Sequence, residues 1–477
     1  MTVPRTRLTS AVMAAALAVL AMSAGLLFHA QTASAEANPP AGTTLTPVLG
    51  WSSWSFFRHS TDAAIVESEA QAMQTSGLEA EGFQYVNLDD FWYECPQGGQ
   101  GPNVDQYGRW VTDPTKYPPG PGGENGIAAL ADYVHGLGEK FGIYVTPGIS
   151  KQAVAENTPI EGTPFTADSI ADKTRQNNYN CGGMTGINFN KPGAQAYVNS
   201  IVDEFAAWGV DYIKLDGITN HNAADVKAWS DAIRQSGRPM QLDVTEGSYT
   251  PKLGPLLDQY ATQWEYSSDI EAYGTPGLTD YAQVKKRFTT LSLWEPMYGG
   301  SQYDGYNDFD SVEVGNCNDP VSASSPFGHE SYANGDGLTY PERQTVLSLW
   351  SLASSPIILG TDLTQLCPQD LSLLENKAVL ALDQDGVDAS LIESENGERI
   401  VAKTTPSGAV AVGLFNTGLK TKTLSVSASA LGLPASSTGY QVNDLWSGTS
   451  YDTASSTFSQ IVPSHGVALF EITPAGS

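Results

Sequence analysis

The chain has 477 residues, 41% of them hydrophobic and 16% charged, which is enough for one large globular domain and a smaller one. There are 24 Lys and Arg against 52 Asp and Glu, for a formal net charge of −28. This acidity disfavours nucleic acid and anionic membranes as partners, whereas neutral ligands such as sugars are unaffected.

The first 35 residues predict a signal peptide. Arg5 and Arg7 precede the apolar stretch AVMAAALAVLAMSAGLLF, and small residues at 33–35 suit cleavage before Glu36. A retained membrane anchor is the alternative, but short Ala-rich segments ending in such a site are usually removed. We therefore expect a secreted protein, with no membrane attachment after cleavage and a net charge of −30.

Between residues 44 and 384, short apolar strands alternate with amphipathic helices. This alternation predicts parallel strands and, most economically, a (β/α)8 TIM barrel. A doubly wound open sheet is the alternative, but no Gly-rich phosphate loop follows the first strand. Strands are expected at 48–54, 85–92, 141–148, 212–217, 241–246, 262–269, 310–315 and 355–362.

Two of the intervening helices have clear sequence signals. Apolar residues recur at helical spacing from Val198 to Trp208, and Gly209 is a stop signal. A second helix opens at Thr339 and Glu342, which stand in capping-box positions.

After residue 387 the pattern changes to alternating apolar and polar residues between turn signals, as in AVAVGLFN and GVALFEIT. This predicts a C-terminal antiparallel β-sandwich. The expected organisation is a signal peptide at 1–35, a barrel at 36–387 and a sandwich at 388–477.

An even number of cysteines in an exported chain favours disulfides, and Cys95, Cys181, Cys317 and Cys367 allow three pairings. We expect Cys95–Cys181 and Cys317–Cys367, which would join loops of the same region. No Cys or His spacing suggests zinc, and neither a metal nor a cofactor is expected.

The segment YIKLDG places two opposite charges on one face of a strand, because strand side chains alternate. Polar residues at the carboxyl ends of barrel strands build active sites. Five expected strands deliver the candidate carboxylates to this rim. The polar and aromatic candidates are Trp51, Trp54, Asp89, Asp90, Tyr144, Lys214, Asp216, Asp243, Glu246, Glu265, Asp269, Asp308 and Asp310.

Clustered carboxylates with aromatic rings suggest glycoside chemistry, which needs two carboxyl groups flanking the scissile bond. The acidity and the missing phosphate loop disfavour phosphoryl transfer. A Ser or Cys nucleophile lacks an evident His partner, since the five histidines after residue 35 read as structural or surface residues.

Several motifs resemble, in order, those of the clan D α-galactosidases, glycoside hydrolase family 27 (melibiases). They include TPVLGWSSW, YVNLDDFW, GIYVTPG, WGVDYIKLDG, NDFDSVEVGN and LWSLASSPIILGTDL. The resemblance covers nearly all of residues 44–390, and the family's usual second domain suits the expected sandwich.

The resemblance implies a retaining mechanism. Asp216 matches the family's nucleophile, and Lys214 matches a residue that touches the sugar. Asp269, five residues after Trp264, matches the acid/base, with Glu265 and Glu271 as rival candidates.

The resemblance also implies residues that bind the sugar. Trp54 matches the ring that packs against it, and Asp89 and Asp90 match the pair that holds its 4- and 6-hydroxyls. Tyr144 and Glu246 match further contact positions.

The chain departs from the family pattern near this site. Glu265 stands where an Arg near the 2-hydroxyl is usual, and Ile218 replaces a Cys that commonly follows the nucleophile. The insert at 150–190 is longer than in eukaryotic members. These departures keep the mechanism but leave the sugar open.

The leading expectation is a secreted retaining exo-α-glycosidase, an α-galactosidase acting on oligosaccharides. An isomalto-dextranase releasing isomaltose from dextran and a β-L-arabinopyranosidase are the alternatives. A non-catalytic sugar-binding protein is a further one, although the matching nucleophile and acid are both present.

Overall fold

The computed structural model describes residues 46–476, apart from 97, 178, 246–250, 266 and 299–304. The expected signal peptide lies outside these residues. In the part described, no helix is long and apolar enough to cross a membrane.

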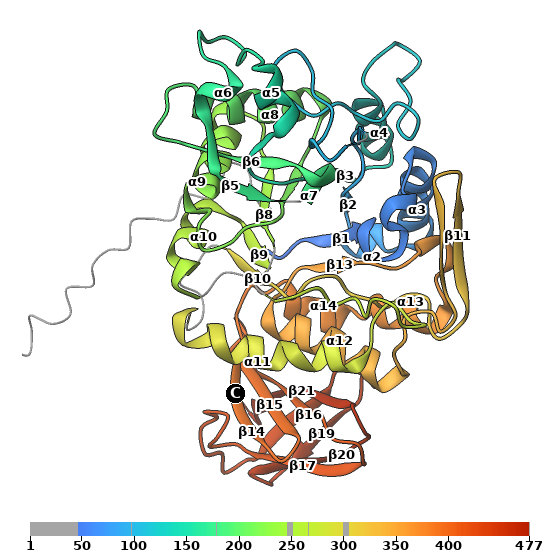
Figure 1. Cartoon of the computed structure of the whole chain (residues 1–477). Helices are drawn as coiled ribbons and strands as arrows, with labels where there is room; N and C mark the ends of the chain where they lie inside the picture. Colours follow the sequence, from blue (N-terminus) through green and yellow to red (C-terminus); the bar gives the residue numbers. More distant parts are fainter. Residues whose placement is uncertain are drawn as a thin grey trace, which may run out of the picture. The chain divides into compact units, whose positions relative to one another are not determined.

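Eight strands form one parallel sheet in the order β10-β9-β8-β7-β3-β2-β1-β13 (Figure 1). A parallel bridge between Val312 and Leu359 joins the chain after β10 to β13, which links the two ends of the curled sheet. The expected (β/α)8 architecture is therefore confirmed. The strands are β1 (Leu49–Ser52), β2 (Tyr85–Leu88), β3 (Lys140–Val145), β7 (Tyr212–Leu215), β8 (Gln241–Val244), β9 (Gln263–Glu265), β10 (Tyr306–Asp308) and β13 (Ile357–Leu359).

Helices occupy the connections between these strands and follow the last strand, β13. They are α2 (Trp54–Phe57), α3 (Ala63–Ser76), α4 (Gly126–Gly136), α8 (Ala194–Trp208), α9 (Ala223–Ser236), α10 (Gly254–Tyr260), α11 (Tyr281–Tyr298), α12 (Tyr340–Ala353), α13 (Pro368–Leu374) and α14 (Lys377–Asp383). Short 3-10 turns lie at Arg58–Ser60, Glu79–Glu81, Pro251–Leu253 and Leu363–Gln365.

Both helices with clear sequence signals are confirmed. Helix α8 ends at Gly209, whose φ of 86° is the left-handed conformation that glycine adopts without a steric cost. Helix α12 begins with the expected capping box, in which the Thr339 backbone N–H donates to Glu342 Oε2 over 2.7 Å.

The seventh strand is not where the sequence placed it. The prediction at 310–315 is wrong, because the strand is Tyr306–Asp308 and only Val312 of the expected segment bridges a neighbour. Val312, Glu313 and Val314 are all buried, so their apolar character reflects burial after the strand rather than sheet pairing.

Two smaller sheets decorate the barrel. The chain between β3 and α8 forms a three-stranded sheet of β4 (Ile149–Ser150), β6 (Met184–Ile187) and β5 (Ala171–Asn177), with α5 (Lys151–Glu156), α6 (Ala167–Ile170) and the turn α7 (Tyr179–Gly182). A hairpin of β11 (Val321–Ser325) and β12 (Gly328–Tyr332) lies between β10 and α12.

The C-terminal part consists of two antiparallel sheets, as expected, and has its own apolar core. The larger sheet has the order β14-β15-β16-β21-β18-β19, and the smaller one pairs β17 with β20. The boundaries 36–387 and 388–477 stay a prediction. The strands are β14 (Ser390–Glu395), β15 (Glu398–Thr404), β16 (Val410–Asn416), β17 (Lys422–Ser427), β18 (Tyr440–Asp444), β19 (Ser450–Thr453), β20 (Thr457–Val462) and β21 (Val467–Pro474).

The larger C-terminal sheet packs on the helices α11 and α12 (Figure 1). Phe288 of α11 meets Phe415 of β16 edge-on, with ring centroids 5.0 Å apart. The fully buried ammonium group of Lys403 forms an ion pair with Asp385 at 2.8 Å and donates to carbonyl oxygens of the barrel part, including that of Ser351.

Candidate active site

The segment YIKLDG lies where the sequence predicts, with its charges at the carboxyl end of β7. Lys214 Nζ pairs with Asp89 Oδ2, which follows β2, at 2.7 Å. Burial opposes the charge of Lys214, but Asp89 and Asp216 outweigh it and raise the pKa of Lys214 well above its ordinary value. The lysine is therefore held as a cation between two carboxylates.

Asp216 is held by its own loop. Its Oδ1 accepts hydrogen bonds from the Gly217 backbone N–H at 2.6 Å and from the Thr245 hydroxyl at 3.0 Å. Burial raises the pKa of Asp216, while Lys214 and these two donors lower it, and the net direction is upward. Neither of these two groups donates to the second carboxylate oxygen, Oδ2, which can therefore contact a ligand.

Asp90 lies next to the Lys214–Asp89 pair. Its Oδ1 accepts hydrogen bonds from the Tyr93 hydroxyl and from the Phe91 backbone N–H. Burial, with Asp89 nearby, raises the pKa of Asp90 to about 7 although these hydrogen bonds lower it. Phe91 has φ of 71°, an uncommon conformation for a bulky residue and one that clusters at functional sites.

Tyr144, at the end of β3, is buried close to these acids. Burial, then Asp90 and Asp216, raise the pKa of the Tyr144 phenol well above its usual value. Its hydroxyl therefore stays protonated and can donate a hydrogen bond.

Asp269 is exposed and lies in the loop after β9. Trp54 Nε1 donates to the Tyr273 hydroxyl at 3.0 Å, and this hydroxyl donates to Asp269 Oδ2 at 2.7 Å. The Trp54 ring stacks on Phe91 with 6.2 Å between centroids. Hydrogen bonds through the Tyr273 hydroxyl thus connect the Trp54 ring to the exposed carboxylate of Asp269.

Asp310 and Arg287 hold the backbone around Asp269 in place. Asp310 Oδ2 accepts from the Ile270 N–H at 2.6 Å, and the fully buried Arg287 donates to the Ser268 carbonyl at 2.8 Å. Arg287 also lies 3.6 Å from Asp310 Oδ2. The residues on both sides of Asp269 are therefore anchored.

The rivals of Asp269 have different surroundings. Glu265 is only 6% exposed, and its Oε1 has no hydrogen-bond partner among the described residues. Burial, then Asp310 and Asp308, raise the pKa of Glu265 well above its ordinary value, which favours a neutral acid. Glu271 is also buried, and burial with Asp310 and Asp269 raises its pKa to about 8.

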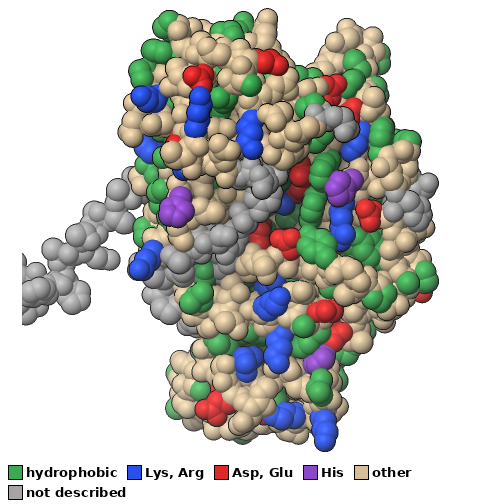
Figure 2. All heavy atoms as spheres, in the orientation of Figure 1, with side chains coloured by type: hydrophobic (Ala, Val, Ile, Leu, Met, Phe, Trp, Pro, Cys, Tyr) green, Lys and Arg blue, Asp and Glu red, His purple; other side chains and the backbone are tan. Residues whose placement is uncertain are grey.

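The structure thus brings together Trp54, Asp89, Asp90, Tyr144, Lys214, Asp216, Glu265 and Asp269 at the strand ends. Figure 2 shows acidic side chains beside hydrophobic ones in a hollow of the face it draws. Glu246 lies outside the described residues. Tyr273 and Arg287 were not predicted, because their roles depend on contacts between separate segments that no local motif reveals.

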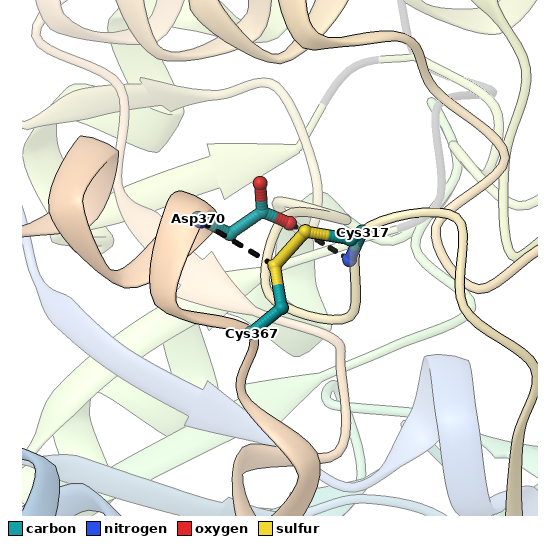
Figure 3. A group of neighbouring side chains, drawn as sticks. All are labelled: Cys317, Cys367 and Asp370. Atoms are coloured by element: carbon teal, nitrogen blue, oxygen red, sulfur yellow. Dashed lines mark hydrogen bonds between the residues drawn. A yellow bond between two sulfur atoms is a disulfide. The ribbon is translucent and has the colours of Figure 1, made fainter.

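Both expected disulfides, Cys95–Cys181 and Cys317–Cys367, are present. In the part of the chain described, one group has metal-ligand types close enough to share an ion, namely Cys317, Cys367 and Asp370. Figure 3 shows that the two sulfurs are joined in the disulfide and that Asp370 accepts from the Cys317 backbone N–H. These three side chains form a covalent and hydrogen-bonded cross-link between β10–β11 and α13.

Comparisons with known proteins agree with this fold. The family model "Alpha galactosidase A" matches residues 46–172 and 329–385, and "Alpha galactosidase C-terminal beta sandwich domain" matches 395–472. α-Galactosidases of Cyamopsis tetragonoloba and Coffea arabica are each 28% identical over 439 residues, covering 91% of this chain and 87% and 95% of the relative.

Solved structures give the same result. A family 27 β-L-arabinopyranosidase from Geobacillus stearothermophilus superposes with a TM-score of 0.80 at 29% identity, covering 91% of this chain and 98% of that one. α-Galactosidase I from Mortierella vinacea has a TM-score of 0.68 at 23% identity, covering 91% and 99%, and shares the fold.

A barrel with these matches and this carboxylate-rich mouth is a glycoside hydrolase. More narrowly, the chain belongs to glycoside hydrolase family 27, the clan D α-galactosidase (melibiase) family.

Proposed function

We propose that the protein is a secreted retaining exo-α-glycosidase, and in the first place an α-galactosidase. The observation that carries this proposal is the environment of Asp216. One of its oxygens is held by Gly217 and Thr245, its charge is favoured by Lys214, and a second carboxylate, Asp269, accepts a hydrogen bond from Tyr273 in the loop after β9.

In the first step of the proposed reaction, Asp216 Oδ2 attacks the anomeric carbon while Asp269 donates its proton to the departing glycosidic oxygen. In the second, Asp269 removes a proton from water, the water oxygen attacks the anomeric carbon, and the bond to Asp216 breaks. Two inversions give net retention. The two carboxyl groups should therefore lie about 5–5.5 Å apart in the sugar complex.

The remaining residues bind the sugar in this proposal. The Trp54 ring packs against its apolar face, and Asp89, Asp90 and Tyr144 bond its hydroxyls. The neutral form of Glu265, whose Oε1 has no partner among the described residues, donates a hydrogen bond to a further hydroxyl, and Glu246 is a further contact residue. Secretion is supported by the signal sequence and by the two disulfides.

A β-L-arabinopyranosidase is the second candidate, favoured by the likeness to the Geobacillus enzyme of that activity. An isomalto-dextranase is the third. Both alternatives are kept because Glu265 and Ile218 depart from the residues that are usual in the α-galactosidases at these positions.

The test is product analysis with protein lacking residues 1–35. It would be incubated with raffinose, with dextran and with 4-nitrophenyl β-L-arabinopyranoside, and the products separated by chromatography. Galactose from raffinose supports the proposal. Arabinose alone, or isomaltose from dextran without galactose, would replace it with the corresponding alternative.

A further inference from the structure

The long insert between β3 and α8 reaches the candidate active site at its tip. The chain leaves the sheet strand β5 and returns in β6 through the turn α7. Within this turn Asn180 and Cys181 have φ of 54° and 57°, a left-handed conformation that asparagine tolerates better than most residues. Two consecutive left-handed residues reverse the chain sharply at this point.

The tip is fixed to the loop that follows β2. Cys181 is joined to Cys95, and its carbonyl accepts from the Gly101 N–H at 3.4 Å. The two backbones pack closely, since a Cβ atom on Gly101 would lie 2.2 Å from the Gly183 carbonyl oxygen. The chain directly after Asn180 is therefore held in place.

Asn180 is 5% exposed, and its side chain bonds residues of two other segments. Its Nδ2 donates to the Tyr93 hydroxyl at 2.7 Å and lies 3.4 Å from the Tyr144 hydroxyl, and its Oδ1 accepts from Thr146. Because the Tyr93 hydroxyl accepts from Asn180, it directs its own proton to Asp90 Oδ1. Such a chain of hydrogen bonds strengthens each member.

We infer that Asn180 is a positioning residue that fixes Asp90 and closes the sugar pocket behind it, so that the enzyme accepts one terminal ring. The inference rests on the proposed function, because it assumes that Asp90 forms hydrogen bonds with sugar hydroxyls. Among the described residues, the Phe91 N–H and the Tyr93 hydroxyl both donate to Asp90 Oδ1, which leaves Oδ2 for the sugar.

We infer that the sugar pocket is closed behind Asp90 because the side chains there are buried and bonded to one another. Behind Asp90, Tyr93 and Tyr144 are each 2% exposed and, with Asn180, form one bonded wall. A second sugar ring beyond Asp90 would have to displace this wall and leave its buried hydroxyl and amide groups unpaired, which is costly. A monosaccharide, rather than a disaccharide such as isomaltose, is the product that this wall permits.

The test compares Asn180→Ala and Asn180→Asp with wild type and with Asn190→Ala, an exposed asparagine on the same insert. Asn180→Asp keeps the size of the side chain but cannot donate to Tyr93. We expect both Asn180 variants to raise KM about tenfold, equivalent to one lost hydrogen bond, with kcat changed less than threefold. Asn190→Ala should match wild type.

Tyr93→Phe keeps the inference testable if Asn180→Ala does not fold. It should raise KM similarly, and the double variant Tyr93→Phe/Asn180→Asp should be no worse than the stronger single variant, because both break one relay. Unchanged KM in Asn180→Asp and Tyr93→Phe, or a disaccharide product from the wild type, would overturn the inference.

Failure of the proposed function has a different outcome. If the wild type releases a monosaccharide other than galactose, the α-galactosidase assignment falls, and the same variants are compared with the glycoside of that sugar. If galactose is released but the Asn180 variants behave as wild type, only the inference falls.

Discussion

Asp216 is an acid whose surroundings act in opposite directions on its ionisation. Burial raises its pKa, whereas Lys214 and two hydrogen-bond donors lower it. Lys214 in turn is paired with Asp89. The net shift of the Asp216 pKa is upward and Lys214 limits it, so removing the lysine would further disfavour the ionised form that nucleophilic attack needs.

Substitution of the two carboxylates should separate their roles. Asp216→Ala should lower kcat about 10⁴-fold or more on every substrate, because no covalent intermediate can form. Asp269→Ala should lower it about 10²–10⁴-fold on raffinose but less on a 4-nitrophenyl glycoside, whose leaving group needs little protonation.

Steady-state kinetics on both substrates measures this difference, with the exposed Asp452→Ala as the matched control. Equal losses for Asp269→Ala on the two substrates would mean that another residue, such as Glu271, is the acid/base.

The buried carboxyl group of Glu271 should make stability depend on pH. Its pKa is raised to about 8, so the folded protein keeps a proton that the unfolded chain releases above about pH 4.3. Between these values the unfolded state binds fewer protons, and the free energy of unfolding falls by about 1.4 kcal/mol per pH unit for this group.

Urea unfolding at pH 4.5 and pH 8 tests this dependence. Glu271→Gln, which is neutral at both values, should be more stable than wild type at pH 8 and nearly equal to it at pH 4.5. An identical pH dependence in the two proteins would show that Glu271 is ionised in the fold.

A functional residue can be predicted from the sequence when it lies in a local motif. The strand-end position of Asp89, Lys214 and Asp216 follows from strand alternation and parallel pairing. Tyr273 and Asn180 could not be predicted, because each acts through a partner more than 80 residues away in the chain.

Elements are predicted well where periodicity and end signals coincide. Helices α8 and α12 have both, and the structure places them as expected. Strand β10 has only the three residues YND and no apolar run. The apolar residues lie in the buried segment that follows, so the strand was predicted there, at 310–315. The number of cysteines alone allows three pairings, and the expectation that each disulfide joins loops of the same region selected the pairing that the structure has.

Glycine in β1 should be required for close strand packing. A Cβ atom on Gly50 would lie 2.2 Å from the Tyr85 carbonyl oxygen of β2, a backbone atom that cannot move without opening the sheet. Gly50→Ala should therefore lower the free energy of unfolding by about 3 kcal/mol.

Gly136→Ala is the matched control, because nothing lies within 4 Å of its added Cβ. Thermal unfolding of both variants measures the effect. An unchanged melting temperature for Gly50→Ala would contradict the packing of β1 on β2.

For the whole molecule, the barrel and the C-terminal sheets share a buried ion pair. Lys403 of β15 is fully buried and bonds Asp385 and several carbonyl oxygens, including those of Leu382 and Val387. Burial lowers the pKa of Lys403, and Asp385 opposes this shift. Removing one partner of such a pair leaves a buried charge without compensation.

Lys403→Ala should therefore destabilise the protein by about 3–5 kcal/mol while the folded fraction keeps its activity. Calorimetry and activity per folded molecule measure the two quantities, with the exposed Lys420→Ala as control. Normal stability in Lys403→Ala would mean that the C-terminal sheets are held by apolar contacts alone.

The proposed reaction depends on retention of configuration at the anomeric carbon. The most direct measurement is proton NMR of raffinose hydrolysis in its first minutes, before the released sugar mutarotates. The proposed roles of Asp216 and Asp269 predict α-galactose as the first product and none with Asp216→Ala. The β-anomer appearing first would mean inversion through an activated water and would contradict a covalent intermediate on Asp216.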